Sequence, residues 1–403
     1  MFRKMLLASA LALAIAAPAS AQSPVRVKFG VLSDMSGIYA DATGQGSVIA
    51  AQMAIEDFQA SQKGIQAEVV GADHQNRPDV GSNVVRQWFD RENVDVVLDT
   101  PTSSVALAVS EVTRERNKVF LNSGAASSDL TGSACSPNTI HWTYDTWALA
   151  NGTGGALVAE GGDTWFFLTA DYAFGHALER DTSNFVTSKG GRVIGAVRTP
   201  FPSSDFSSFL LQAQASRAKV IGLANAGGDT INSIKQAGEF GITQGGQRLA
   251  GLLVFDTDIH SLGLRTAQGL VLTAPFYWDR DDATRAFAAR YEQRHPRRLK
   301  PTYVHAGVYS SVMHYLKALE KTRSAADGAK MVAEMKAMPT DDPLFGKGEV
   351  RQDGRKIHPM YLYQVKTPAE SRGAWDYNKL LRTIPAAEAF RPLRDGGCSL
   401  VRS

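Results

Sequence analysis

The amino-acid sequence predicts an α/β protein with two parallel sheets, and three observations carry this prediction. Short apolar runs that end in small polar residues recur along the chain, which is typical of buried parallel strands. Stretches with one apolar helical face lie between them, and this alternation indicates parallel sheets with right-handed crossovers. The chain has 403 residues, which is too long for one ordinary core, so we expect two domains.

The first predicted strand lies in VKFGVL, residues 27–32, and runs into a polar, glycine-rich loop, residues 33–46. The loop residues favour turns and offer small polar groups, so we expect a ligand to approach them. Residues 47–60 follow as a helix. Its apolar stripe consists of Val48, Ala51, Ile55 and Phe58.

The remaining elements fall into two series of strands. The first sheet continues at residues 67–73, 94–100 and 118–124, with helices at 81–92 and 105–116. The second sheet is predicted at residues 164–175, 192–200, 218–229 and 248–258. A helix between two of these strands begins after Ser204 or Asp205, either of which suits an N-cap.

No low-complexity linker separates the two series. The chain is expected to pass between the domains at residues 141–147, 269–278 and, as a third candidate, 346–354. Several short crossings form a hinge rather than a flexible tether.

The N-terminal segment, residues 1–21, resembles a cleavable signal peptide. Arg3 and Lys4 precede a short apolar run, and Ala19-Ser20-Ala21 fits the small-residue rule for cleavage after Ala21. No cysteine follows that site to take a lipid, and no later apolar run approaches the roughly 20 residues that span a bilayer. We therefore expect export to the periplasm.

Charge gives no support for a nucleic-acid or anionic-membrane partner. The formal net charge is +3, and removal of Arg3 and Lys4 lowers it to +1. The basic stretch at residues 290–301 is interpreted as a solvated helix end with a proline stop.

The chain contains two cysteines, Cys135 and Cys398, and both would lie in an oxidising compartment. We predict a disulfide between them, with two free thiols as the alternative. A bridge across 398 − 135 = 263 positions would contribute at most about 5 kcal/mol in the chain-entropy model.

Candidate binding residues follow the strands, because parallel α/β sheets bind ligands at the carboxyl ends of their strands. Small residues there let a ligand reach backbone N–H groups, and hydroxyls complete a carboxylate site. For each hydroxyl, helix N-capping is the alternative role. The first-sheet candidates are Tyr39, Thr102, Ser103, Ala125, Ala126 and Ser127.

The second sheet offers carboxylates and aromatic side chains at its strand ends. A carboxylate suits a ligand ammonium, and an aromatic ring suits an apolar ligand body. Asp256 and Asp258 are equally suited to turns or caps, and Phe174 to packing. These candidates are Asp171, Tyr172, Phe174, Asn225, Asp229, Asp256 and Asp258.

Catalytic signatures are absent from the sequence. Gly44-Gln45-Gly46 begins a G-x-G, but Ile49 stands where a dinucleotide fingerprint requires a third small residue. There is no Walker motif and no H-E-x-x-H, and the eight histidines lack metal-ligand spacing. We therefore predict neither an enzyme nor a metal or cofactor site.

Several stretches in this order resemble one family. From Val25 to about Tyr363 the chain is similar to the periplasmic solute-binding proteins of branched-chain amino-acid ABC transporters, the leucine/isoleucine/valine-binding family. The resemblance implies the type I periplasmic binding protein fold, in which two Rossmann-like lobes joined by a three-segment hinge close on a ligand. The matching stretches are VLSDMSGIYADATGQG, VDVVLDTPTSS, LNSGAASSDLT, DYAFG, DFSSFLLQ and VFDTDIHSLG.

The resemblance also implies lobe boundaries. Lobe 1 would comprise residues 25–142 plus 274–345, and lobe 2 residues 143–273 plus 346–403. The loop 33–46 would then form one lip of the cleft between them.

By the same resemblance, the first lobe would hold a ligand carboxylate. Thr102 and Ser103 fall where the family places hydroxyls on this group, and residues 125–127 would supply backbone N–H groups and another hydroxyl.

The second lobe would contact the rest of the ligand. Tyr172 or Phe174 would close over it, and Asp256 falls near an acidic residue that binds the α-ammonium in amino-acid binders. One departure is Gly227-Gly228, where those binders often carry a tyrosine, and this predicts a wider or differently shaped pocket.

The leading hypothesis is a monomeric periplasmic capture protein that delivers an amino acid or related small carboxylate to an ABC permease in the inner membrane. An aromatic or other organic acid is the alternative ligand. A periplasmic sensor subunit of the same fold is a second hypothesis, and a secreted α/β enzyme is a third.

Overall fold

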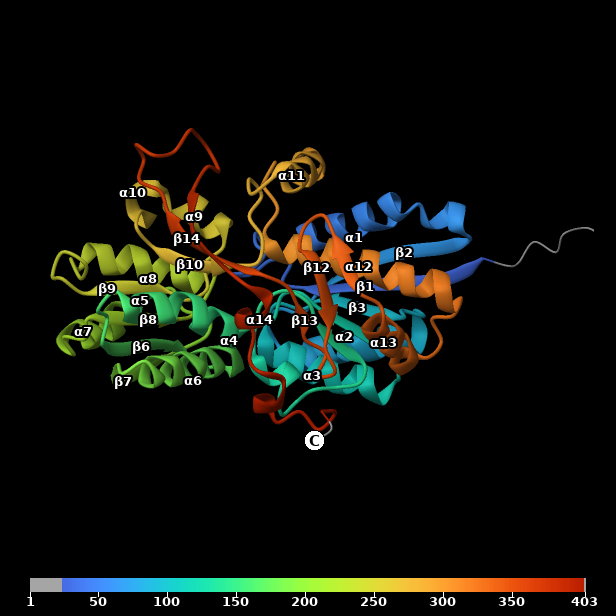
Figure 1. Cartoon of the computed structure of the whole chain (residues 1–403), viewed down its shortest axis with the longest axis horizontal. Helices are drawn as coiled ribbons and strands as arrows, with labels where there is room; N and C mark the ends of the chain where they lie inside the picture. The colour runs from blue at the N-terminus through green and yellow to red at the C-terminus, as the bar shows by residue number, and fades with distance from the viewer. Residues whose placement is uncertain (1–23, 402–403) are drawn as a thin grey trace, which may run out of the picture.

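The computed structural model describes residues 24–401, which form two α/β lobes lying side by side (Figure 1). Each lobe contains its own parallel sheet, so the predicted fold class is confirmed. The predicted signal peptide, residues 1–21, lies outside the described residues.

The first lobe is built on a five-stranded parallel sheet with strand order β2-β1-β3-β4-β5. Phe29 of β1 pairs with Val69 of β2 on one side and Val96 of β3 on the other. Strand β1 thus has a paired strand on each side and lies inside the sheet, next to the edge strand β2. The strands are β1 (Val25–Ser33), β2 (Ile65–Asp73), β3 (Val96–Asp99), β4 (Val119–Asn122) and β5 (Thr139–His141).

Helices from two distant parts of the chain cover this sheet. Helix α12 packs along α1, and the ring of Tyr315 meets Phe29 edge-on with centroids 5.4 Å apart. The C-terminal half of the chain therefore completes the first core. The helices of this lobe are α1 (Gly44–Phe58), α2 (Pro78–Arg91), α3 (Ser103–Glu115), α11 (Asp282–Arg294), α12 (Tyr303–Thr322) and α13 (Gly328–Ala337).

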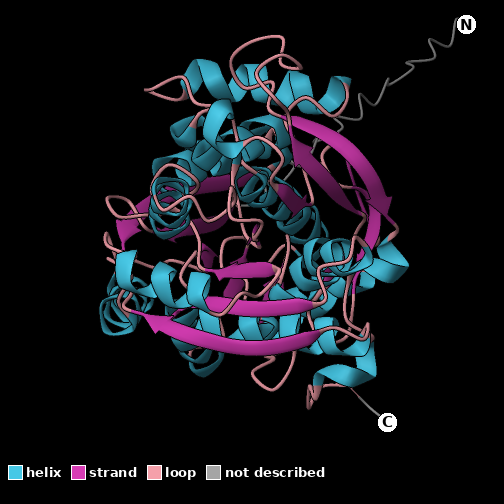
Figure 2. Ribbon diagram, turned by 90° about the vertical axis from the view of Figure 1, so that its left-hand side faces the viewer, coloured by secondary structure: helices cyan, strands magenta, loops and turns pink. Residues whose placement is uncertain are grey.

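The second lobe has a four-stranded parallel sheet with order β7-β6-β8-β9, and helices lie on both of its faces (Figure 2). Its strands are β6 (Thr164–Ala170), β7 (Arg192–Thr199), β8 (Val220–Ala224) and β9 (Arg248–Gly251). Its helices are α4 (Thr146–Leu149), α5 (Gly155–Ala159), α6 (Ala173–Ser188), α7 (Ser207–Ala215), α8 (Gly228–Glu239), α9 (Asp256–Leu262) and α10 (Leu264–Ala267).

Two small antiparallel sheets supplement the lobes. Strands β10 (Val271–Ala274), β14 (Met360–Val365) and β15 (Asn378–Ile384) form one beside β9. Strands β11 (Thr340–Asp342), β12 (Gly346–Val350) and β13 (Lys356–Ile357) form the other, against α13. Residues 346–357 therefore lie with the first lobe, whereas the predicted boundaries placed them in the second.

The chain crosses between the lobes after β5, after β10 and after β13. The third crossing is at residues 358–359, because the candidate segment 346–354 is β12 and its turn. There His358 Nε2 hydrogen-bonds the Thr143 carbonyl oxygen at 2.6 Å, which joins the third crossing to the first.

A fourth crossing follows β15. Helix α14 (Ala386–Ala389) leads the chain back toward the first lobe, where η4 (Leu393–Gly396) packs against η2 (Ser128–Thr131). Figure 1 shows this C-terminal segment below the junction of the two lobes.

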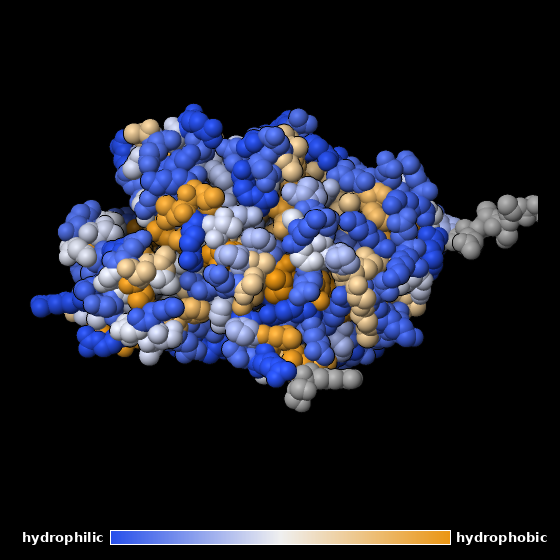
Figure 3. Space-filling model, viewed as in Figure 1, coloured by the Kyte–Doolittle hydropathy of each residue, from blue (hydrophilic) through white to orange (hydrophobic). Residues whose placement is uncertain are grey.

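The surface drawn in Figure 3 is hydrophilic over most of its area, with apolar residues in separate small areas. Among residues 24–401, no helix has both the length and the apolar character needed to cross a bilayer.

Candidate functional site

A small cavity of about 10 Å³ lies between the lobes, at the carboxyl ends of strands from both sheets. The loops after β1, β3 and β4 supply the first wall, and those after β6, β8 and β9 supply the second. This is the place where parallel α/β sheets bind ligands. The lining residues are Tyr39, Pro101, Gly124, Ala126, Tyr144, Tyr172, Phe174, Ala226, Leu253 and Phe255.

The cavity walls are apolar and largely aromatic. Tyr172 stacks on Phe201 with centroids 3.9 Å apart. On the other side Tyr303 stacks on Phe255 at 4.9 Å and meets Tyr144 edge-on at 5.0 Å. None of the ten lining residues carries a charge. Such walls suit a flat apolar body, with orientation left to a few polar groups.

The two lobes touch directly beside the cavity. The hydroxyls of Tyr39 and Tyr172 lie 2.6 Å apart, one from each lobe. The Gly228 N–H donates to the Ile38 carbonyl oxygen at 3.3 Å. The structure therefore shows the lobes in contact across the cleft.

The glycine pair does not widen the pocket, so the first of the two predicted alternatives, a wider or a differently shaped pocket, is wrong. A Cβ on Gly227 would lie 2.5 Å from the Ile38 carbonyl oxygen, and Gly227 itself has φ of +57°. The loop after β1 occupies the space in front of the glycines, so these residues permit close approach of the opposite lobe.

The predicted first-lobe hydroxyls, those of Thr102, Ser103 and Ser127, are not among the groups that line the cavity, but they are close to the lining residues Pro101 and Ala126 in the chain. The Ser127 N–H donates to Ser103 Oγ at 3.2 Å, while Ser127 Oγ donates to Asp129 Oδ2 at 3.2 Å. No hydrogen bond donated by Ser103 Oγ is found among the described residues. Thr102 Oγ1 donates to Asn76 Oδ1, so this hydroxyl positions the loop. Of these three hydroxyls, Ser103 is thus the one whose proton is available for a hydrogen bond to a ligand.

Other predicted site residues have structural partners. Ala125 is buried, and its N–H donates to Asn122 Oδ1 at 3.0 Å. Asn225 is also buried, and its side chain bonds those of Thr230 and Ser233. Four predicted residues line the cavity directly: Tyr39, Ala126, Tyr172 and Phe174.

The remaining lining residues were not predicted as site residues. Tyr144 belongs to the first predicted crossing, and Phe255 directly precedes the acidic pair Asp256 and Asp258. Their position after a strand or at a crossing is the sequence signal that could have identified them as site residues. An apolar residue at such a position is, however, equally consistent with core packing.

The Asp256 side chain is bonded to Asn378 of β15 rather than lining the cavity. Its Oδ1 accepts a hydrogen bond from Asn378 Nδ2 at 2.7 Å, and burial raises its pKa to about 7. Asp258 caps its own helix by accepting from the Phe255 N–H at 2.9 Å. Both acids therefore have roles within the second lobe, and neither is among the residues that line the cavity.

We predict that Asp256→Asn changes the pH dependence of stability. Between about pH 4 and pH 7 the folded protein holds a proton on Asp256 that the unfolded chain has released. This group therefore lowers stability as the pH rises through that window. Urea unfolding should show the mutant gaining stability relative to the wild type between pH 5 and pH 8. Asp341→Asn, at an exposed position, is the control, and a difference that does not change with pH would contradict the prediction.

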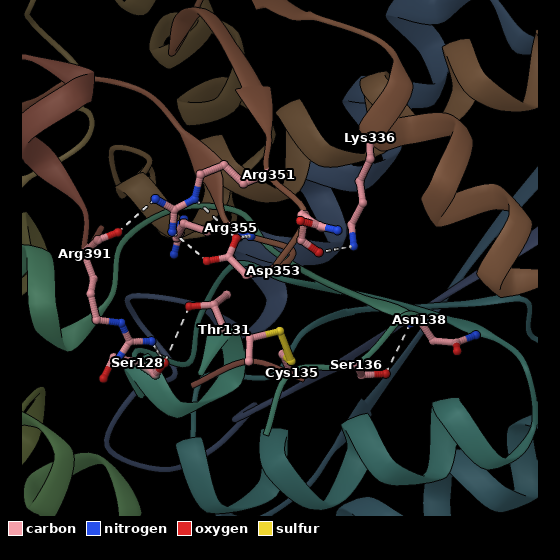
Figure 4. The surroundings of a disulfide bond; sticks show 12 residues. Ser128, Thr131, Cys135, Ser136, Asn138, Lys336, Arg351, Asp353, Arg355 and Arg391 are labelled. Atoms are coloured by element: carbon pink, nitrogen blue, oxygen red, sulfur yellow. Dashed lines mark hydrogen bonds and ion pairs between the residues drawn. A yellow bond between two sulfur atoms is a disulfide. The ribbon is translucent and has the colours of Figure 1, made fainter. Parts of the chain in front are cut away.

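The disulfide predicted from the sequence is formed between Cys135 and Cys398. Figure 4 shows Arg391 and Arg351 near it, above the segment that carries Ser128. Arg391 Nη2 donates to the Ser128 carbonyl oxygen at 3.0 Å. The bridge thus fastens the C-terminal segment next to the loop that supplies Ala126 and Ser127.

Metal-binding groups of three or more His, Cys, Asp or Glu side chains do not occur within residues 24–401. His141 and His358 are fully buried, and burial lowers the pKa of each well below the usual range. These two histidines are interior side chains of the crossings.

Two parallel α/β lobes that meet over a cavity at the ends of their strands define the class of two-lobed ligand-binding proteins. The family model described as periplasmic binding protein matches residues 26–373, and the chain belongs to this family. The resemblance stated from the sequence is therefore confirmed.

Solved structures support the same assignment. The chain is 49% identical to a periplasmic binding protein from Burkholderia mallei, with a TM-score of 0.91 and coverage of 94% of this chain and 100% of that one. It is 38% identical to a branched-chain amino-acid ABC transporter periplasmic ligand-binding protein from Burkholderia xenovorans LB400, with a TM-score of 0.82 and coverage of 93% and 99%. The type I fold is thus confirmed.

A curated relative agrees with these structures. A Leu/Ile/Val-binding protein homolog from Brucella melitensis is 24% identical over 283 residues, which cover 69% of this chain and 71% of the relative. The family and these neighbours are binding proteins, not enzymes, and family membership implies a periplasmic location.

Proposed function

We propose that the protein is the solute-binding component of an ABC importer, which captures a small carboxylate-bearing solute in the periplasm and delivers it to an inner-membrane permease. The observation that carries this proposal is the cavity between the lobes, to which both sheets contribute their strand ends. The kinship with the Burkholderia xenovorans transporter protein supports the importer role.

The first lobe offers groups suited to a carboxylate. Ser103 Oγ has a proton to donate, and Ala126 brings backbone within reach of the cavity. Ser103 also begins α3, a helix of 13 residues. The partial positive charge at the N-terminus of a helix favours an anionic group.

The second wall favours an aromatic or other organic acid over an aliphatic amino acid. An amino acid needs a counter-charge for its ammonium, because an unpaired charge in a closed cleft costs several kcal/mol. Asp256, the residue predicted for this role, bonds Asn378 instead, and no charged residue lines the cavity. The aromatic rings of Tyr172, Phe174 and Phe255 line the cavity and suit a flat ring.

A thermal-shift screen tests the binding role and the ligand class together, because a ligand that binds only the folded protein raises its melting temperature. The screen compares aliphatic and aromatic amino acids with benzoate-type and aliphatic organic acids. We expect the largest shift from an aromatic carboxylic acid. No shift from any carboxylate would contradict the proposal.

Replacing Ser103 and Ser127 together by Ala is expected to weaken binding of the best screened acid by about 10- to 100-fold. Hydrogen bonds to a charged group are worth about 1.5–3 kcal/mol each, and Ser127 contributes mainly by holding the loop. Calorimetric titration measures the change. Ser110→Ala, which alters a buried hydroxyl bonded to Thr139, is the control. Unchanged affinity in a folded double mutant would show that both hydroxyls have only structural roles.

A further inference from the structure

The second lobe holds a buried carboxylate with one unused oxygen. Asp229 is the second residue of α8 and is 1% exposed. Its Oδ1 accepts the Ser203 N–H at 3.0 Å. Its Oδ2 is buried and has no hydrogen-bond partner among the described residues. Buried polar atoms are nearly always paired, so an unpaired carboxylate oxygen indicates a missing partner.

This carboxylate lies near the tyrosine pair, although it is not itself among the residues that line the cavity. Phe201 stacks on Tyr172 at 3.9 Å, and two residues later Ser203 holds Asp229. Burial raises the pKa of the Tyr39 and Tyr172 hydroxyls, and the neighbouring Asp229 charge raises both further. Both tyrosines line the cavity. Asp229 therefore lies behind the wall that the second lobe contributes to the cavity.

The tyrosine pair also has an unused group. Two hydroxyls carry two protons, and the 2.6 Å contact between Tyr39 and Tyr172 uses one of them. The second proton has no acceptor among the described residues. A spare donor and a spare acceptor therefore lie in the same region of the second-lobe wall, and no hydrogen bond joins them directly.

We propose that Asp229 and the Tyr39–Tyr172 pair recognise a hydroxyl group on the body of the bound solute. The hydroxyl accepts the spare tyrosine proton and donates its own proton to Asp229 Oδ2. This inference rests on the proposed function and narrows its ligand class to hydroxylated carboxylic acids.

A hydroxyl fits this position better than an ammonium or an unsubstituted carbon. An ammonium group only donates, so it would leave the tyrosine proton without an acceptor. A C–H group would leave both protein groups unpaired, and a site built to bond a hydroxyl rejects analogues that lack one. None of the lining residues carries a charge, so Asp229, behind the second-lobe wall, supplies the charged acceptor for the hydroxyl.

Titration of the wild-type protein with 4-hydroxybenzoate, benzoate and 4-aminobenzoate tests the inference. We expect 4-hydroxybenzoate to bind at least tenfold more tightly than either analogue. Equal affinities within threefold would overturn the inference while leaving the binding role in place. Binding of amino acids but not of these acids would also overturn the inference and leave the binding role in place. If no acid in the screen binds, the proposed function is overturned as well.

Asp229→Asn tests the residue itself. The Asn oxygen can keep the bond to the Ser203 N–H, which places an NH₂ donor where the hydroxyl needs an acceptor. We expect benzoate affinity to stay within threefold and the preference for 4-hydroxybenzoate to fall below threefold. Asp258→Asn, another buried acid that bonds a backbone N–H, should keep the preference.

Tyr172→Phe provides a second variant that does not depend on how well Asp229→Asn folds. It removes one hydroxyl of the pair. The Tyr39 hydroxyl then loses its hydrogen-bond partner and is no longer held in one orientation. The preference for the hydroxylated acid is expected to fall at least fivefold. Retention of the full preference in both variants would overturn the assignment of these residues.

Discussion

Replacing Gly227 with Val is expected to weaken solute binding at least 100-fold while both lobes stay folded. A Cβ at this position would lie 2.5 Å from the Ile38 carbonyl oxygen and 2.9 Å from Cδ1 of the Tyr39 ring. Both contacts belong to the opposite lobe. The clash therefore exists only when the lobes meet, and the substitution disfavours the closed arrangement that encloses a ligand.

The size of this effect follows from the populations of the two arrangements. A shift of about 2.7 kcal/mol against closure reduces apparent affinity about 100-fold, because the ligand must first restore the closed arrangement. A clash with a backbone oxygen cannot be relieved by rotating a side chain. Valine adds two methyl groups to the Cβ, so the opposite loop would have to move.

A matched glycine separates this clash from backbone strain. Gly241 also has a positive φ, +64°, and the nearest atom to its Cβ is Gln244 Oε1 at 3.8 Å. Gly241→Val should lose stability, since valine is strained at positive φ, but keep its affinity. Calorimetric titration of both variants measures the difference. Affinities within threefold of each other would show that Gly227 does not limit closure.

The fold was accessible from the sequence because its signals are local. Apolar runs ending in small polar residues marked the parallel strands, and the strand-end rule then located Tyr39, Ala126, Tyr172 and Phe174, all of which line the cavity. The antiparallel additions were missed because they stand outside the two series of alternating strands and helices. Strand β13 has only two residues, but β14 and β15 are longer than β3 and β4.

The directions of side chains were not accessible, because their partners are distant in the chain. Asp256 bonds Asn378, 122 positions away, and Thr102 bonds Asn76, 26 positions away. Gly227 illustrates the same limit. Its small size suggested empty space, yet the loop of the other lobe fills that space. A sequence shows which groups a strand end offers, whereas the fold decides which of them remain unpaired.

The fourth crossing also depends on a contact, the disulfide, that cannot be predicted from the spacing of the two cysteines alone. Two cysteines 263 positions apart carry no information on proximity, and the prediction of a bridge rested on the oxidising compartment. In the structure the bridge holds the segment after β15 against η2, so the C-terminal segment adds a covalent tie beside the candidate carboxylate site.

Replacing Cys135 and Cys398 together by Ser is expected to lower the melting temperature by about 5–10 °C. The chain-entropy model gives at most about 5 kcal/mol for a loop of this length, and each kcal/mol shifts the midpoint by about 2 °C in a protein of this size. Without the bridge, the C-terminal segment is still held by hydrogen bonds. Arg391 still bonds the Ser128 carbonyl oxygen, and Arg351 Nη1 bonds the Arg391 carbonyl oxygen at 2.8 Å.

A reductant provides the control for the disulfide prediction. Dithiothreitol should lower the wild-type midpoint to that of the double mutant and leave the mutant unchanged, because the mutant has no bond to reduce. Ligand affinity should fall less than tenfold, since the loop that carries Ser127 keeps its bonds to Ser103 and Asp129. Wild type and mutant melting within 1 °C of each other would show that these polar contacts alone hold the C-terminal segment, and that the covalent bond adds nothing to them.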